Sequence, residues 1–118
     1  MNKIQFSKES SKLLKEKYGC NVFRLNAFSY KLINKLIKPK QTEVPKNMKV
    51  KEHLHSYKSY YLVSNNALKF EDNIFELPEY ALVLIKPNKK HPWINTNKTK
   101  VYVGDLSPNH GQQIVVPS

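Results

Sequence analysis

Two groups of side chains in this sequence could do chemistry: a cluster of acids and a pair of histidines. The acids are Glu71, Asp72, Glu76 and Glu79. Neighbouring carboxylates can hold Mg²⁺ or act in acid–base catalysis. The same stretch contains a proline and has the composition of a solvated turn. The plainer interpretation is therefore surface charge that balances nearby lysines.

The histidines and the single cysteine limit other kinds of chemistry. His53 and His55 are one residue apart, so on a strand both imidazoles would lie on the same face and could share a metal ion. Lysines near the pair would repel a divalent cation, so we expect no metal site there. Cys20 has no partner for an internal disulfide, which favours a reducing compartment. No apolar run suits a signal peptide or a membrane span, so we expect a cytoplasmic protein without membrane insertion.

Positive charge is concentrated in the first half of the chain. Residues 1–58 carry fourteen Lys or Arg against four acids, a balance of +10, whereas residues 59–118 carry six against five, a balance of +1. Like charges at this density repel one another, which favours an anionic partner such as nucleic acid or an acidic protein surface. Nearly all the cations are lysines, which suit phosphates, whereas bidentate recognition of guanine usually requires arginine. The composition thus favours contact with a phosphate backbone.

The predicted contact residues lie between positions 31 and 61. Tyrosines there stand among cations, a mixture that can stack on bases while it neutralises phosphates. The same tyrosines would also suit a strand with one face in the core. The predicted nucleic-acid-binding residues are Lys31, Lys35, Lys38, Lys40, Lys46, Lys49, Lys51, Lys58, Tyr57, Tyr60 and Tyr61.

Two helices are predicted in the first third of the chain. Ser7 is a suitable N-cap, and Gly19 a suitable left-handed C-terminal residue, for a helix over 8–18. Asn26 is a suitable N-cap for a second helix over 27–37, where apolar residues recur at helical spacing until a proline follows.

The second half has the composition of a sheet. Short β-branched or aromatic runs, separated by turn-forming stretches, occur at 60–63, 74–77, 81–85 and 101–103, and 114–116 would pair as a last strand. We therefore predict an α+β fold, a single compact domain in which two N-terminal helices precede a small, mostly antiparallel β-sheet. Its regions would be a basic helical region (residues 1–38), an exposed basic connector (residues 39–52) and a β-rich region (residues 53–118).

The stretch 60–85, YYLVSNNALKFEDNIFELPEYALVLI, resembles a segment of the small restriction-endonuclease-like domains of the PD-(D/E)xK type, with a likeness over about residues 43–87. The resemblance implies a Mg²⁺-dependent nuclease whose acids hold the metal and whose lysine helps to activate water. The nearest counterparts here are Glu43 and Lys46, with an acid from Glu71 or Asp72. Two residues separate Glu43 from Lys46 where the family has one, and no Asp precedes Asp72. The catalytic motif is therefore degenerate or absent.

The sequence thus predicts a non-enzymatic protein, of phage or mobile-element origin, that binds nucleic acid largely without sequence preference and without a cofactor. One alternative is the Mg²⁺-dependent nuclease. Another is a structural or inhibitory protein that docks on an acidic protein partner or enters a virion or ribonucleoprotein assembly. In that case residues 111–118 would form an arm that adds a strand to a neighbour.

Overall fold

The computed structural model describes residues 2–44, 53–90, 92–97, 101–106 and 113–115, with side chains for all of these except 53–55 and 113–115. Within these ranges two helices lie among eleven strands. In chain order the elements are β1 (Asn2–Ile4), α1 (Lys8–Tyr18), β2 (Cys20–Arg24), α2 (Ala27–Ile37), β3 (Lys40–Val44), β4 (His53–His55), β5 (Ser59–Ser64), β6 (Ala67–Phe70), β7 (Asn73–Glu76), β8 (Tyr80–Ile85), β9 (Trp93–Ile94), β10 (Val101–Asp105) and β11 (Gln113–Val115).

Both helices span the predicted residues, because local capping sets their ends. The Ser7 hydroxyl accepts a hydrogen bond from the Ser10 backbone N–H at 3.1 Å, and the Ser10 hydroxyl accepts one from the Ser7 N–H at 2.8 Å. This reciprocal pair fixes the start of α1, and Gly19 ends it in a left-handed conformation with φ of +67°. The Asn26 side chain accepts from the Ser29 N–H at 2.7 Å and so begins α2.

The predicted order of elements, two helices followed by a sheet, is wrong. β1 precedes α1, and β2 lies between the helices, so residues 1–38 do not form a purely helical region. A portion of the predicted connector is strand β3, while residues 45–52 lie outside the described residues. β2 pairs with β8, and β3 pairs with β10. Partners far along the chain define these short strands, so their own composition does not mark them.

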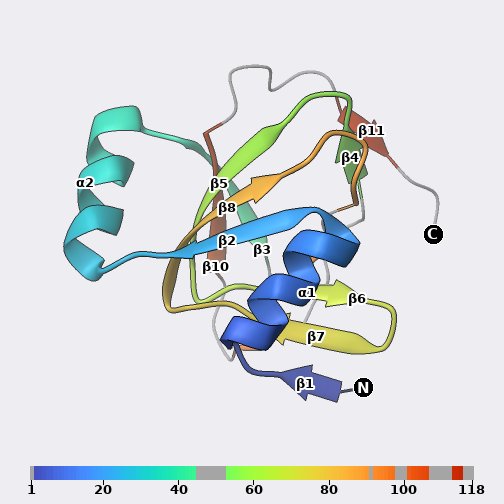
Figure 1. Cartoon of the computed structure of the whole chain (residues 1–118). Helices are drawn as coiled ribbons and strands as arrows, with labels where there is room; N and C mark the ends of the chain where they lie inside the picture. Colours follow the sequence, from blue (N-terminus) through green and yellow to red (C-terminus); the bar gives the residue numbers. More distant parts are fainter. Residues whose placement is uncertain (1, 45–52, 91, 98–100, 107–112, 116–118) are drawn as a thin grey trace.

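The strands form three sheets (Figure 1). The five-stranded sheet has the order β2-β8-β5-β10-β3, and every neighbouring pair in it is antiparallel. The four-stranded sheet has the order β1-β7-β6-β9, in which β1 runs parallel to β7. The third sheet pairs β11 with β4. Residues 113–115 of the predicted arm therefore pair within this chain.

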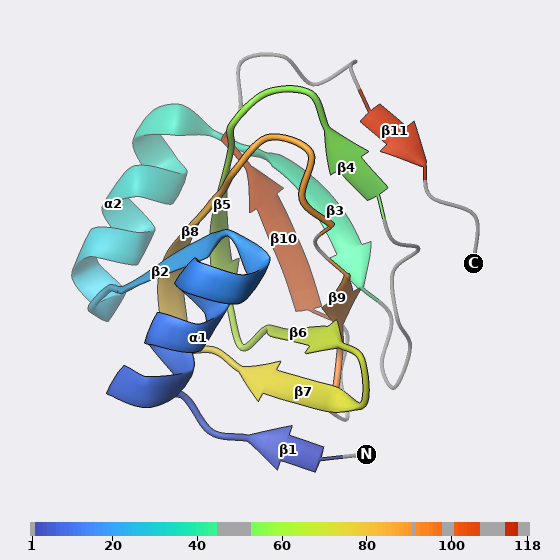
Figure 2. The same cartoon turned by 45° about the vertical axis from the view of Figure 1, so that its right-hand side comes forward.

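One hydrophobic core is shared by the two larger sheets and α1. Along β8 the burial alternates, and Ala81, Val83 and Ile85 face the core. Phe75 of β7 and Leu14 of α1 are completely buried in the same cluster. α1 lies beside β2 and near β6 and β7 in two views of the molecule (Figures 1 and 2). This packing brings the end of α1 next to the β6–β7 turn.

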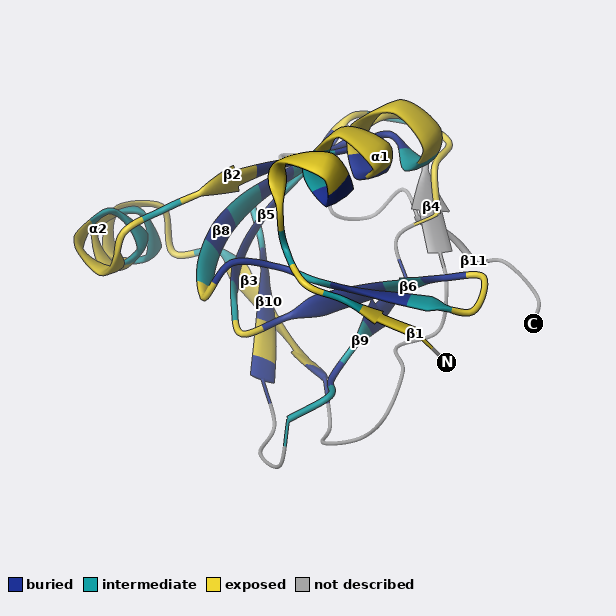
Figure 3. Cartoon of the chain, turned by 60° about the horizontal axis from the view of Figure 1, so that its bottom comes forward, coloured by how far each residue is buried: buried dark blue, intermediate teal, exposed yellow. Residues whose placement is uncertain are grey.

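α2 stands apart from the core and has no buried residue. It lies beyond the end of β2, with exposed residues along its outer side (Figure 3). On its inner side the Tyr30 ring lies 4.9 Å from the Tyr80 ring, measured between centroids, and Asn34 Oδ1 accepts a hydrogen bond from Gln41 Nε2 at 3.3 Å. In the described part of the chain, neither helix is long and apolar enough to cross a membrane.

Candidate anion-binding site

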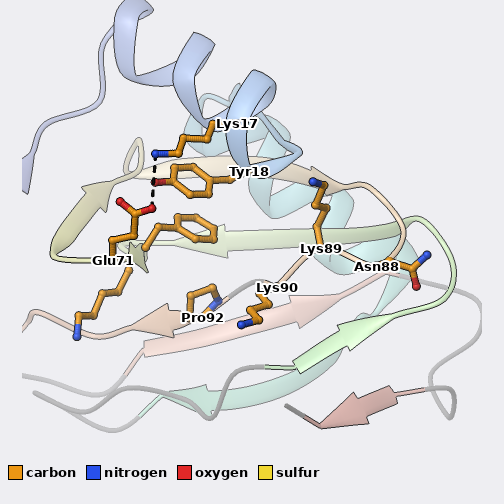
Figure 4. Close-up of a pocket in the computed structure, with 9 residues that line it drawn as sticks. Lys17, Tyr18, Glu71, Asn88, Lys89, Lys90 and Pro92 are labelled. Atoms are coloured by element: carbon orange, nitrogen blue, oxygen red, sulfur yellow. Dashed lines mark ion pairs between the residues drawn. The ribbon is translucent and has the colours of Figure 1, made fainter. Parts of the chain in front are cut away.

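A pocket of about 330 Å³ lies between the end of α1, the β6–β7 turn and the segment that follows β8 (Figure 4). We call it the Tyr18 pocket. Four lysines line it: Lys17, Lys69, Lys89 and Lys90. Glu71 is its one acidic lining residue among those that the structure describes. The pocket is therefore positively charged, although three of its lysines come from the nearly neutral half of the sequence.

Aromatic rings form one wall of the Tyr18 pocket. The Tyr18 ring stacks on Phe70, with 4.0 Å between centroids and 11° between planes. The Lys17 ammonium lies 5.3 Å from the centroid of the Tyr18 ring and 3.5 Å from Glu71 Oε1. Phe70 covers one face of the Tyr18 ring, and Phe75 packs edge-on against it with 5.9 Å between centroids, which leaves less of the ring for a nucleic-acid base to stack on. The pocket therefore suits phosphates better than bases.

The electrostatics of Lys17 follow from the same contacts. Its hydrogen bond with the Tyr18 hydroxyl and the charge of Glu71 raise the pKa of the Lys17 ammonium. Lys17 is therefore charged at neutral pH. Glu71 has a φ of +58° in the two-residue turn between β6 and β7, a conformation that residues with a side chain adopt infrequently. This turn places the carboxylate beside Lys17.

A second, smaller pocket of about 120 Å³ adds three more lysines: Lys15, Lys58 and Lys86. We call it the Gly19 pocket, because Gly19 lines it together with Asn21 and Leu84. No acid from the described part of the chain lines this pocket. The Lys58 ammonium also lies 6.0 Å from the centroid of the Tyr60 ring.

Gly19 lies where the two pockets adjoin. The Lys86 N–H donates a hydrogen bond to the Gly19 carbonyl at 3.0 Å. A Cβ on Gly19 would lie 2.9 Å from Lys89 Cγ and 3.4 Å from Lys86 Cβ. Lys86 lines one pocket and Lys89 the other. We call the seven lysines of both pockets the lysine surface: Lys15, Lys17, Lys58, Lys69, Lys86, Lys89 and Lys90.

The predicted lysines divide among three places. Lys58 belongs to the lysine surface. Four others are exposed on or next to α2 and β3 and line neither pocket: Lys31, Lys35, Lys38 and Lys40. The last three, Lys46, Lys49 and Lys51, lie outside the described residues.

The predicted tyrosines differ in burial. Tyr60 is half-buried beside Lys58. Tyr57 is also half-buried, and burial together with the charge of Asp105 raises the pKa of its hydroxyl. Tyr61 is only 3% exposed and packs edge-on against Trp93, with 5.5 Å between centroids. Since its ring belongs to the core, Tyr61 has no free face for a base.

The residues suggested for a nuclease are not assembled into a metal site in the described part of the chain. Glu43 is exposed on β3, in the five-stranded sheet, whereas Glu71 and Asp72 occupy the turn of a hairpin in the four-stranded sheet. Lys46 and the side chains of β4 lie outside the described residues. The residues that are described contain no group of three or more His, Cys, Asp or Glu that could hold a metal ion.

Sequence reasoning missed six of the seven lysines of the lysine surface: Lys15, Lys17, Lys69, Lys86, Lys89 and Lys90. The one local signal was the pair at 89–90 in a turn-forming stretch after a predicted strand. Comparisons with protein-family models, with curated proteins and with solved structures gave no match. The chemistry of the site therefore has to be inferred from its own side chains. Lysine ammonium groups act as point charges and hydrogen-bond donors for phosphate oxygens, without the bidentate geometry of arginine.

Proposed function

We propose that the protein binds the phosphate backbone of nucleic acid through the lysine surface, without catalysis and largely without sequence preference. The observation that carries this proposal is the convergence of seven lysines from four separate stretches of the chain around two adjoining pockets. Within the described ranges of the chain, Glu71 is the only acid that lines these pockets. A single small anion would need fewer charges, whereas a polyanion can engage several of them together.

Two further features support contact with the backbone. Among the residues that the structure describes, no arginine lines either pocket, and arginine is the residue that most often reads guanine. In the Tyr18 pocket, Phe70 already covers one face of the Tyr18 ring, which disfavours recognition of bases by stacking. Lysine contacts with phosphates position a protein on nucleic acid but carry no sequence information.

The test is a salt titration of binding to fluorescein-labelled oligonucleotides of unrelated sequence, as single-stranded DNA, duplex DNA and RNA. If about six phosphates are neutralised, the plot of log affinity against log salt concentration should have a slope of about −5 for duplex DNA. The double variant Lys86→Ala/Lys90→Ala, with one change in each pocket, should make this slope shallower by about two. The affinity for all the oligonucleotide sequences should fall by a similar factor.

The matched control is Lys31→Ala/Lys35→Ala, which removes the same charge from α2. It should change the slope much less, because these lysines line neither pocket. Equal effects of the two double variants would refute the assignment to the lysine surface. Binding that does not depend on salt would refute the proposed function itself.

A further inference from the structure

The outer side of α2 carries an unusual concentration of exposed apolar side chains. Seven large apolar residues are exposed in the described part of the chain, and four of them lie on α2. Their exposed fractions are 74% for Phe28, 44% for Leu32, 73% for Leu36 and 57% for Ile37. α1, a helix of the same length, buries Leu14 completely. Exposed apolar groups gathered in this way mark interaction sites.

The apolar residues and the lysines of α2 form two adjacent rows. Phe28, Leu32 and Leu36 are four residues apart, so they follow one another along one side of the helix. Lys31 and Lys35 precede Leu32 and Leu36 by one position, and helical geometry places them together along one flank of that row. The helix contains no acidic residue. We call Phe28, Leu32 and Leu36 the apolar row.

α2 is held in place by contacts that leave the apolar row unused. Asn26 caps its first turn, Tyr30 contacts Tyr80, and Asn34 accepts a hydrogen bond from Gln41. None of these contacts involves a residue of the apolar row. The helix is therefore preformed, and a partner that binds the row does not have to order it first.

We propose that the apolar row docks into an apolar groove with an acidic rim on another protein. Residues four apart on one side of a helix are the usual anchors of a helix in a groove. The rim must be acidic because the row is flanked by lysines and the helix has no acid of its own. This inference goes beyond the proposed function and uses a different surface, because no residue of α2 lines either pocket.

An antiparallel pair of copies and a lipid membrane fit this surface less well. If two copies paired through α2 in an antiparallel, two-fold arrangement, both lysine rows would fall on the same side of the interface and repel each other. A membrane surface is uniform in all lateral directions, whereas Lys31 and Lys35 lie on one flank of the row only. A groove with a single acidic rim matches this one-sided pattern.

The test is photo-crosslinking with the full chain in extracts of the cells that naturally make it. A benzoylphenylalanine residue replaces Phe28 in one protein and Tyr102 in the control, because Tyr102 is an exposed residue of β10. Crosslinked products are identified by mass spectrometry, and the identified partner is purified. Its affinity is then measured for the unmodified protein, for Leu36→Ser, for Lys31→Gln/Lys35→Gln and for the control Lys8→Gln/Lys12→Gln on α1.

We expect one identified partner to crosslink from position 28 and not from position 102, with the crosslink in an apolar groove beside acidic residues. Leu36→Ser should weaken the affinity by about tenfold or more, as expected for an anchor residue. Lys31→Gln/Lys35→Gln should weaken it severalfold, and increasing salt should do the same, whereas Lys8→Gln/Lys12→Gln should have little effect. The nucleic-acid affinity and far-ultraviolet spectrum of Leu36→Ser should be unchanged, which separates this proposal from the proposed function.

Four results would overturn the proposal. The first is the absence of a crosslink from position 28, and the second is a crosslink to a second copy of this chain alone. The third is an identified partner that binds Leu36→Ser as tightly as it binds the unmodified protein. The fourth is binding to phosphatidylserine vesicles that is lost in Leu36→Ser, which would assign the row to a membrane surface.

Discussion

At the scale of single residues, Glu71 is the one carboxylate among the described residues that lines either pocket, and it pairs with Lys17. A phosphate bound beside Lys17 would be repelled by this charge. Glu71→Gln should therefore raise the affinity for a duplex oligonucleotide about two- to fivefold at low salt. Fluorescence anisotropy measures this change. Glu43→Gln removes the same charge from β3 outside both pockets, and an equal gain in that variant would contradict the local explanation.

Cys20 is a buried residue whose chemistry is suppressed by its surroundings. The side chain is fully buried, and this burial raises the pKa of the thiol from 9.0 to about 12. At pH 8 the native protein should react with a thiol reagent at least roughly a hundredfold more slowly than the urea-unfolded chain, because thiolate is the reactive form. Absorbance of the released chromophore follows the reaction. Equal rates in both states would show that the thiol is accessible.

The raised pKa of Cys20 also fixes the sign of its effect on stability. Between pH 9 and pH 12 the unfolded chain loses this proton while the folded chain keeps it. Cys20 therefore lowers the free energy of unfolding as the pH rises through this range, and it has no such effect below pH 9. Labelling should accordingly be carried out at or below pH 8.

At the scale of elements, the turn from α1 to β2 requires glycine for two separate reasons. Gly19 has φ of +67°, and an added Cβ would approach Lys89 Cγ to 2.9 Å. Gly19→Ala should lower the free energy of unfolding by about 1–2 kcal/mol. In the Lys89→Ala background, where Cγ is absent, Gly19→Ala should lower the free energy of unfolding less. Only the cost of the left-handed backbone conformation, about 1 kcal/mol, then remains. Urea unfolding of the four proteins measures both values, and identical costs in the two backgrounds would contradict the contact with Lys89.

The two helices should respond differently to loss of their caps, because only α1 carries a residue into the core. Ser7→Ala should lower the global free energy of unfolding by about 1 kcal/mol. Asn26→Ala should change the global value by less than about 0.5 kcal/mol but should increase amide hydrogen exchange across 27–37, since α2 buries no residue. Urea unfolding and hydrogen exchange make the comparison. A global loss for Asn26→Ala as large as that for Ser7→Ala would mean that α2 stabilises the fold as much as α1 does.

At the scale of the whole molecule, the two larger sheets share one core and should unfold together. Trp93 of β9, in the four-stranded sheet, is 2% exposed and contacts Tyr61 of β5, in the five-stranded sheet. Its fluorescence therefore reports on the contact between the sheets. The urea midpoints from Trp93 fluorescence and from far-ultraviolet circular dichroism should coincide. Separate midpoints would show that the sheets unfold independently.

The charge of the whole molecule is distributed differently from the charge of its sequence. Before residue 59, Lys15 and Lys17 of α1 and Lys58 belong to the lysine surface, whereas the described lysines on or next to α2 and β3 do not. Lys69, Lys86, Lys89 and Lys90 join the first group from the nearly neutral half. A count of charge along the chain identified a basic protein. It did not identify the lysine surface, because that surface depends on contacts between distant segments.

The sequence alone determined the features that depend on neighbouring residues. The bounds of both helices followed from the caps at Ser7, Gly19 and Asn26, and the strand-forming runs of the second half became β5, β7, β8 and β10. These signals are local, since a cap acts within one helical turn and a β-branched run favours an extended backbone wherever it pairs.

Only the tertiary structure decided which segments meet. It made Cys20–Arg24 and Lys40–Val44 strands by pairing them with β8 and β10, placed Tyr61 in the core, and left the apolar row of α2 exposed. It also brought lysines from both halves of the chain around Gly19. Pairing and burial are interactions between residues far apart in sequence, and a residue's own type carries no information about the partner that the fold will give it.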